Sequence, residues 1–151
     1  MSAALLVVAG CSAAAGQTSR GDAGQDRPLS LRVLDSGSRS GVTTQQESVI
    51  RTPEEWQTLW QAHHADGGRP LPAVDFSREM SIAIFGGQRP TGGFAVAVEQ
   101  VTESTSGIEV AYRVTSPPPG AIVSQALTSP FQIIAVPSRR GPVRFRRLPD
   151  S

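Results

Sequence analysis

The chain of 151 residues contains no lysine, so all 14 of its basic side chains are arginines. This absence reflects the base composition of the gene more than chemistry, although arginine favours bidentate contacts with carboxylates and phosphates. The formal net charge at pH 7 is only +1, which excludes a general electrostatic attraction to nucleic acid or to membranes. Cysteine is nearly absent, and the single residue Cys11 excludes a disulfide within the chain.

Aromatic residues are also scarce, at 5% of the chain. The few that are present are therefore expected to supply most of the bulk of the core: Trp56, Trp60, Phe76, Phe85, Phe94, Tyr112, Phe131 and Phe145. The length fits one domain plus a tail, because a core of ordinary size needs ~100–150 residues.

The N-terminus carries a short apolar run, residues 3–10, that ends in small residues immediately before Cys11. It is too short to span a bilayer, which takes ~20 residues, and it fits the apolar part of a signal peptide. Val8-Ala9-Gly10-Cys11 resembles the lipobox of bacterial lipoproteins, which implies a signal peptide at residues 1–11 and acylation of Cys11. Met1 to Ala4 lacks the basic residues of a signal peptide, which favours a start site further upstream. The alternative is an apolar N-terminus with an unmodified thiol.

Residues 12–28 are rich in small and polar residues without apolar periodicity, and we expect a flexible tether there. A single domain is predicted at residues 29–151. Its clearest element is a helix at about residues 53–64, with Thr52 as N-cap and Glu55 completing a capping box. Four side chains of this helix share one face at i, i+3, i+4, i+7 spacing: Trp56, Leu59, Trp60 and His63. Gly67-Gly68 is expected to end it.

The remaining segments alternate in polarity and are separated by turns, which predicts strands at Leu31–Val33, 42–51, 80–85, 93–101, 108–114, 126–136 and 143–148. Arg89 to Val96, with its proline, threonine and two glycines, is typical of the break in a hairpin, where glycines supply positive φ. The predicted fold class is α+β: a mainly antiparallel sheet, small barrel or sandwich, with one principal helix.

No catalytic motif is found. The serines lie outside nucleophile motifs, and no glycine-rich loop has phosphate-binding spacing before a helix. His63 and His64 are adjacent, and neighbouring helical side chains point in different directions, so the two are not expected to share a metal ion. Asp66 and Asp75 leave a weak metal site as an alternative to a solvated helix end.

The C-terminal strand is basic, with Arg144 and Arg146 on one face and Val143 and Phe145 on the other. We interpret it as an edge strand protected by charge. The alternative is a site for an anionic partner; nucleic acid is not expected, because no aromatic side chains alternate with the charges to stack on bases.

Three stretches carry a resemblance to a known family: the apolar strand Ile82–Gly87 after Val74-Asp75-Phe76, the turn Arg89-Pro90-Thr91-Gly92-Gly93-Phe94, and residues 116–131. Over roughly residues 49–146, with a core at about 74–146, the chain resembles the PrcB C-terminal domain, named for an accessory subunit of a bacterial cell-surface protease complex. Thr91–Phe94 and Thr128–Phe131 are the most specific matches. Two departures are Ala121, where the family often has cysteine, and phenylalanine at the aromatic positions, where tyrosine is usual.

The resemblance implies a non-enzymatic, exported accessory domain, often lipid-anchored at the periplasmic or cell-surface side, without catalytic residues, metal or cofactor. Its partner is expected to be an envelope protein, with a protease among the candidates. The predicted partner-binding residues lie in three loops that must meet at one end of the sheet: Arg89, Thr91, Gly92, Gly93, Phe94, Pro119, Gly120, Thr128, Pro130 and Phe131.

Two other functions stay open. Arg89 to Phe94 is similar to the P-T-T-G-Y loop of chagasin-type cysteine-protease inhibitors, which also use several loops at one end of a β-sandwich. An enzyme is the third hypothesis, and it requires His63 in a cleft against an acid and a serine.

Overall fold

Residues 26–150 are described by the computed structural model, and this part of the chain holds one helix and eight strands. The predicted signal peptide, Cys11 and nearly all of the predicted tether lie outside this range. In chain order the elements are β1 (Arg27–Pro28), β2 (Arg32–Gly37), β3 (Gln45–Ile50), α1 (Pro53–His63), β4 (Glu79–Gly86), β5 (Ala95–Ser104), β6 (Gly107–Thr115), β7 (Phe131–Pro137) and β8 (Val143–Leu148).

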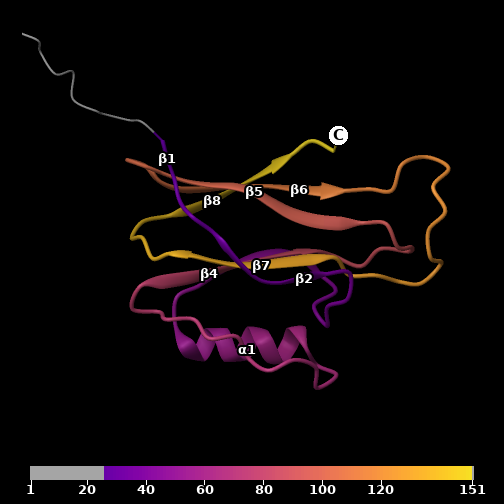
Figure 1. Cartoon of the computed structure of the whole chain (residues 1–151), viewed down its shortest axis with the longest axis horizontal. Helices are drawn as coiled ribbons and strands as arrows, with labels where there is room; N and C mark the ends of the chain where they lie inside the picture. Colours follow the sequence, from indigo (N-terminus) through magenta and orange to yellow (C-terminus); the bar gives the residue numbers. More distant parts are fainter. Residues whose placement is uncertain (1–25, 151) are drawn as a thin grey trace, which may run out of the picture.

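The strands form two four-stranded sheets that pack face to face, and α1 covers the outer face of one of them (Figure 1). The strand order is β1-β5-β6-β8 in the first sheet and β2-β7-β4-β3 in the second. Both described sheets end in edge strands, so the sandwich form of the predicted α+β class is confirmed and a closed barrel is not formed. One pairing was not expected: β8 runs parallel to β6, whereas the other paired strands are antiparallel.

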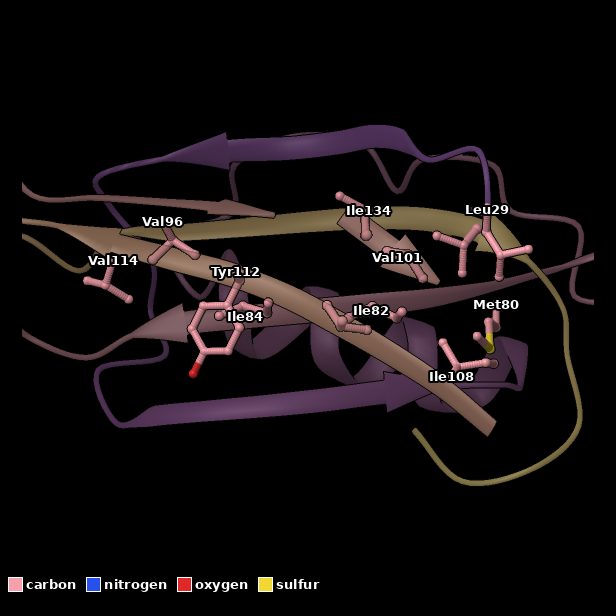
Figure 2. Close-up of a cluster of buried hydrophobic side chains, with 12 residues drawn as sticks. Leu29, Met80, Ile82, Ile84, Val96, Val101, Ile108, Tyr112, Val114 and Ile134 are labelled. Carbon is pink, nitrogen blue, oxygen red and sulfur yellow. The ribbon is translucent and has the colours of Figure 1, made fainter. Parts of the chain in front are cut away.

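The middle of the second sheet is buried on both faces. Because side chains alternate along a strand, Ile82 and Ile84 of β4 face the first sheet, while Ala83 and Phe85 face α1. Figure 2 shows the cluster between the sheets, to which β7 contributes Ile134. The near-continuous apolar sequence of β4 is therefore explained by two separate contacts, one on each side of the sheet.

Seven of the eight aromatic residues lie in or against these two clusters, as expected, and Phe94 lies in neither. Five are buried and three are half-buried: Trp56, Trp60, Phe85, Tyr112 and Phe131 in the first group, and Phe76, Phe94 and Phe145 in the second.

Helix α1 begins as predicted, because Oγ1 of Thr52 accepts a hydrogen bond from the N–H of Glu55 at 3.3 Å. Its buried face includes Trp56, Trp60 and His63. The helix ends at His63, four residues before the glycines expected to end it, and His64 is the C-cap.

A departure from regular pairing changes which side chains of β5 are buried. The register shifts between Val98 and Gln100, so that Val96 and Val101 are both buried although they are five positions apart and would face opposite sides of a regular strand. The folded domain begins slightly earlier than predicted. Strand β1 pairs with β5, so the first sheet starts two residues before residue 29, the predicted start of the domain.

Candidate functional site

The segment 87–94 is not a hairpin turn, because it connects β4 in the second sheet to β5 in the first. Residues 116–130 connect β6 back to β7 and so return the chain from the first sheet to the second. Phe85 of β4 pairs with Phe131, and Ala95 of β5 pairs with Thr115. Both crossings therefore lie at the same end of the sandwich, which we call the crossing end (Figure 1).

Backbone hydrogen bonds join the two crossings. Arg89 and Thr128 exchange both backbone bonds, at 2.7 and 2.9 Å. The N–H of Gly92 donates to the carbonyl of Ser124 at 2.9 Å. Oγ1 of Thr128 donates to the carbonyl of Thr91 at 2.7 Å. The motifs Thr91–Phe94 and Thr128–Phe131 thus lie together in the structure, because the two crossings supply hydrogen-bond partners to each other.

Glycine is required at Gly93 for two separate reasons. Its φ of +86° lies in the left-handed region, and a Cβ at this position would lie 2.7 Å from Cβ of Pro117 and 2.9 Å from Cγ1 of Val123. Gly120 also has a positive φ, +78°, but no atom lies within 4 Å of where its Cβ would be. Gly93 thus fixes contact between the crossings, whereas Gly120 serves only its own turn.

The ten residues predicted to bind a partner do come together at the crossing end, but they differ in exposure. Thr128, Pro130 and Phe131 are buried; Arg89, Thr91, Gly92 and Phe94 are half-buried; Gly93, Pro119 and Gly120 are exposed. The ring of Phe131 lies against the imidazole of His63, with centroids 4.1 Å apart. Thr128, Pro130 and Phe131 therefore hold the crossing end together and do not form its outer surface.

Two exposed apolar side chains at the crossing end were missed from the sequence. Ile122 is fully exposed, at 103%, and Leu127 is 64% exposed. Leu127 was assigned to a strand at 126–136, but β7 begins only at Phe131. The sequence did contain a signal of this exposure, because both large apolar residues lie in a segment rich in proline and glycine.

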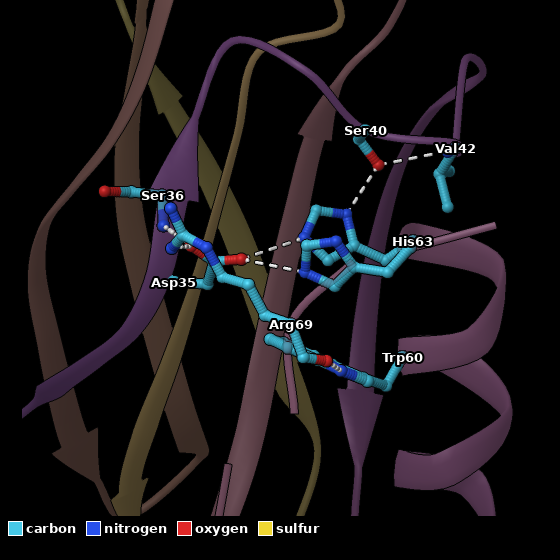
Figure 3. A network of polar contacts seen from close by, with 8 residues as sticks. Asp35, Ser36, Ser40, Val42, Trp60, His63 and Arg69 are labelled. Carbon is cyan, nitrogen blue, oxygen red and sulfur yellow. Dashed lines mark hydrogen bonds and ion pairs between the residues drawn. The ribbon is translucent and has the colours of Figure 1, made fainter. Parts of the chain in front are cut away.

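A buried polar cluster at the C-terminal end of α1 overturns the expectation that the two histidines point apart. Nε2 of His63 and Nε2 of His64 each lie 3.2 Å from Oδ2 of Asp35 (Figure 3). The expected divergence applied to two residues within a regular helix, and His64 has left the helix with φ −110° and ψ 52°. Of the two aspartates considered with the histidines, Asp75 accepts hydrogen bonds from Ser77 in its own turn, and Asp66 is not part of the group formed by Asp35, His63 and His64.

The side chain of Asp35 reaches this cluster because of a bulge in β2. Val33 pairs with Ile134, but Asp35 pairs with Ile133 rather than with Gln132. The extra residue turns Asp35 toward the side of the sheet that α1 covers. The sequence contains no signal of this register shift, so Asp35 was not a candidate.

The same cluster supplies the contacts that the enzyme hypothesis requires. Oγ of Ser40 lies 2.7 Å from Nδ1 of His63, whose Nε2 faces Asp35. The backbone N–H groups that could stabilise an oxyanion next to Ser40 are engaged, however: Gly41 donates to the carbonyl of His63 at 2.8 Å, and Val42 donates to Oγ of Ser40 at 3.0 Å. This arrangement orients the imidazole but leaves no oxyanion site beside the serine.

Burial lowers the pKa of His63, and the hydrogen bond that its imidazole makes to the carboxylate of Asp35 opposes this effect. A neutral imidazole is therefore favoured at His63. The carboxylate of Asp35 is also held by the guanidinium of Arg69, whose Nη1 lies 3.0 Å from Oδ1 of Asp35.

The basic strand β8 is an edge strand, as predicted. Arg146 forms an ion pair with Glu109 at 2.8 Å, and Arg139, just before the strand, forms one with Glu103 at 3.1 Å. Part of the positive charge is thus compensated within the first sheet.

Among the described residues, no helix has the length and apolar character needed to cross a membrane.

Comparison with known proteins gives one family. No curated protein and no solved structure matches the chain. Residues 80–137 match the family model described as PrcB C-terminal. The match runs from β4 through β7 and includes both crossings, but it is narrower than the 49–146 expected and does not include α1. This match supports the predicted resemblance of the chain to the PrcB C-terminal family over residues 80–137.

Proposed function

We propose that the chain is a non-catalytic, exported accessory protein that binds a partner protein, a component of a protease complex, at the cell envelope. The family of residues 80–137 supports an accessory domain associated with a protease complex. The crossing end is the proposed contact surface.

The observation that carries this proposal is the exposure of Ile122 and Leu127 on the crossing at residues 116–130. Backbone hydrogen bonds attach this crossing to the one at residues 87–94. Covering a fully exposed isoleucine contributes about 1.5–3 kcal/mol. The backbone hydrogen bonds of Gly92 to Ser124 and of Arg89 to Thr128 flank Leu127, and Ser124 lies two positions after Ile122. These bonds restrain the segment before binding, which lowers the entropy lost on association. The expected partner surface is an apolar groove.

The chemistry of the crossing end also favours binding over catalysis. Arg89 is the one residue with an ionisable side chain in segments 86–94 and 116–130. Its Nη2 donates to the carbonyl of Gly86 at 2.9 Å, and its Cζ lies 5.4 Å from the centroid of the Phe94 ring. These segments supply neither a general base nor a general acid.

Co-purification of the full chain from envelope membranes tests the proposal. The wild type should enrich a definite partner, and Ile122→Asp should reduce its recovery at least about tenfold, because a buried charge opposes an apolar contact. Val33→Asp is the matched control, since Val33 is 49% exposed on β2, away from the crossings. Equal recovery with both variants would refute the crossing end as the contact surface.

Lipid attachment at Cys11 is the proposed means of localisation. Mass spectrometry of the mature N-terminus should find a diacylglyceryl group on Cys11, and Cys11→Ser should release the protein from membranes while keeping partner binding. An unmodified thiol in the membrane fraction would contradict this part of the proposal.

The two alternatives have separate assays. A fluorophosphonate probe should leave Ser40 unlabelled, and titration against papain-like and chymotrypsin-like proteases should cause no stoichiometric loss of their activity. Labelling of Ser40 would support an enzyme, and stoichiometric inhibition would support a chagasin-like inhibitor.

A further inference from the structure

The cluster of Asp35, His63 and His64 has the composition and spacing of a metal site. Its three ligand atoms, Oδ2 of the aspartate and Nε2 of each histidine, lie within 4.8 Å of one another. Imidazole nitrogen and carboxylate oxygen are both zinc ligands, and three protein ligands leave a fourth position for water.

The distances fit a bound ion better than strong hydrogen bonds. Zinc bonds of about 2.0–2.1 Å to tetrahedral ligands place those ligands about 3.3 Å apart. Both imidazole nitrogens lie 3.2 Å from Oδ2 of Asp35. Hydrogen bonds from a neutral N–H to an oxygen span about 2.7–3.2 Å, so both contacts lie at the long end of that range.

The surrounding contacts hold the ligands in the orientation a metal needs. Nδ1 of His63 lies 2.7 Å from Oγ of Ser40, which leaves Nε2 directed at the cluster. Oδ1 of Asp35 accepts from Arg69 at 3.0 Å and from the N–H of Ser36 at 2.9 Å, so Oδ2 remains for the ion (Figure 3). Partners on the outer atoms of ligands are typical of metal sites.

A route to the cluster also exists. The side chains of Asp35 and His63 are 3% and 0% exposed, but that of His64 is 16% exposed. A pocket of about 230 Å³ borders His63 and is lined by both Asp66 and Arg39. Of the three ligands only His64 has an exposed part of its side chain, so an ion would reach the cluster past His64.

We propose that Asp35, His63 and His64 bind a divalent transition-metal ion of the zinc type, which links β2 to the C-terminal end of α1. This proposal does not rest on partner binding at the crossing end. It also accounts for the bulge in β2, which brings the carboxylate to the helix.

The test uses the full chain without a polyhistidine tag and with Cys11→Ser, so that the thiol does not bind zinc. Competition against a chromophoric chelator should give one Zn²⁺ per chain. His64→Gln should weaken this binding at least about tenfold, whereas the matched control Asp75→Asn should leave it unchanged. Equal affinity in His64→Gln and its parent, or no binding by the parent, would overturn the proposal.

A second measurement needs no substitution at the site. The chain contains only two histidines, so imidazole ¹⁵N spectra during a zinc titration report both ligands directly. Nε2 of both rings should shift and carry no proton at one equivalent of zinc, while Nδ1 of His63 stays protonated against Ser40. Protonated Nε2 atoms in the presence of zinc would contradict the site, even if His64→Gln proved too unstable to test.

Discussion

Ionisation of Tyr112 is a direct probe of the packing between the two sheets. The side chain is buried in the cluster between the sheets, with its hydroxyl pointing out of the cluster (Figure 2). The phenol donates a hydrogen bond to Oε1 of Glu47 on β3. Burial, followed by the bond to Glu47, raises the pKa of Tyr112 to about 12. In an unfolded chain it is about 10.

This difference has a calculable effect on stability. A shift from about 10 to about 12 corresponds to about 3 kcal/mol. Because the pKa is higher in the folded state, the stabilisation is fully present below about pH 10 and is lost as the pH rises through about 12. Lysine is absent from the chain and arginine stays protonated in this range, so Tyr112 dominates the titration there.

The chain's single tyrosine makes the assay simple. Tyrosinate absorbance should rise with a midpoint near pH 12 in the native protein, with circular dichroism reporting any unfolding at the same pH. In concentrated urea the midpoint should be near 10. Glu47→Gln should lower the native midpoint but keep it above 10, because burial is the larger cause. A native midpoint at 10 would refute the described packing of Tyr112 between the sheets.

Two further predictions concern the joined crossings. In urea denaturation, Gly93→Ala should lose at least about 1 kcal/mol more stability than Gly120→Ala. Both glycines have a positive φ, but only at Gly93 would a Cβ contact Pro117 and Val123. Equal losses would contradict that contact. Thr128→Val should lose about 1–3 kcal/mol by leaving the carbonyl of Thr91 without its partner, and Thr128→Ser should keep most of the stability; a neutral Thr128→Val variant would show that the bond is not important.

Local elements could be predicted because their signals are contiguous. Thr52, Pro53 and Glu55 mark the start of α1, and the spacing of Trp56 and Trp60 defines its buried face. The alternation of β6 likewise follows from residues within the strand. These features depend on side chains a few residues apart, so the sequence alone identifies them.

Strand order and pairing could not be predicted, since they depend on contacts between distant segments. The break at 87–94 has the composition of a hairpin turn, and nothing local distinguishes a turn within one sheet from a crossing between two. The parallel pairing of β8 with β6 likewise depends on where the chain returns after β7.

The sequence predicted part of the crossing end but none of the Asp35 cluster, again because local signals can be identified and contacts between distant segments cannot. The motifs around Gly93 and Thr128 identified the crossing end, although they selected buried residues and missed Ile122. The cluster at Asp35 was missed altogether, because it depends on a bulge in β2 and on the non-helical conformation of His64.

Photo-crosslinking in living cells tests the central claim most directly, that the crossing end contacts a partner protein. A photoreactive amino acid in place of Ile122 should form a covalent adduct with one definite envelope protein. The same group in place of Val33, also exposed but on β2, should form none with that protein. Equal adducts at both positions, or an adduct only at position 33, would contradict the account.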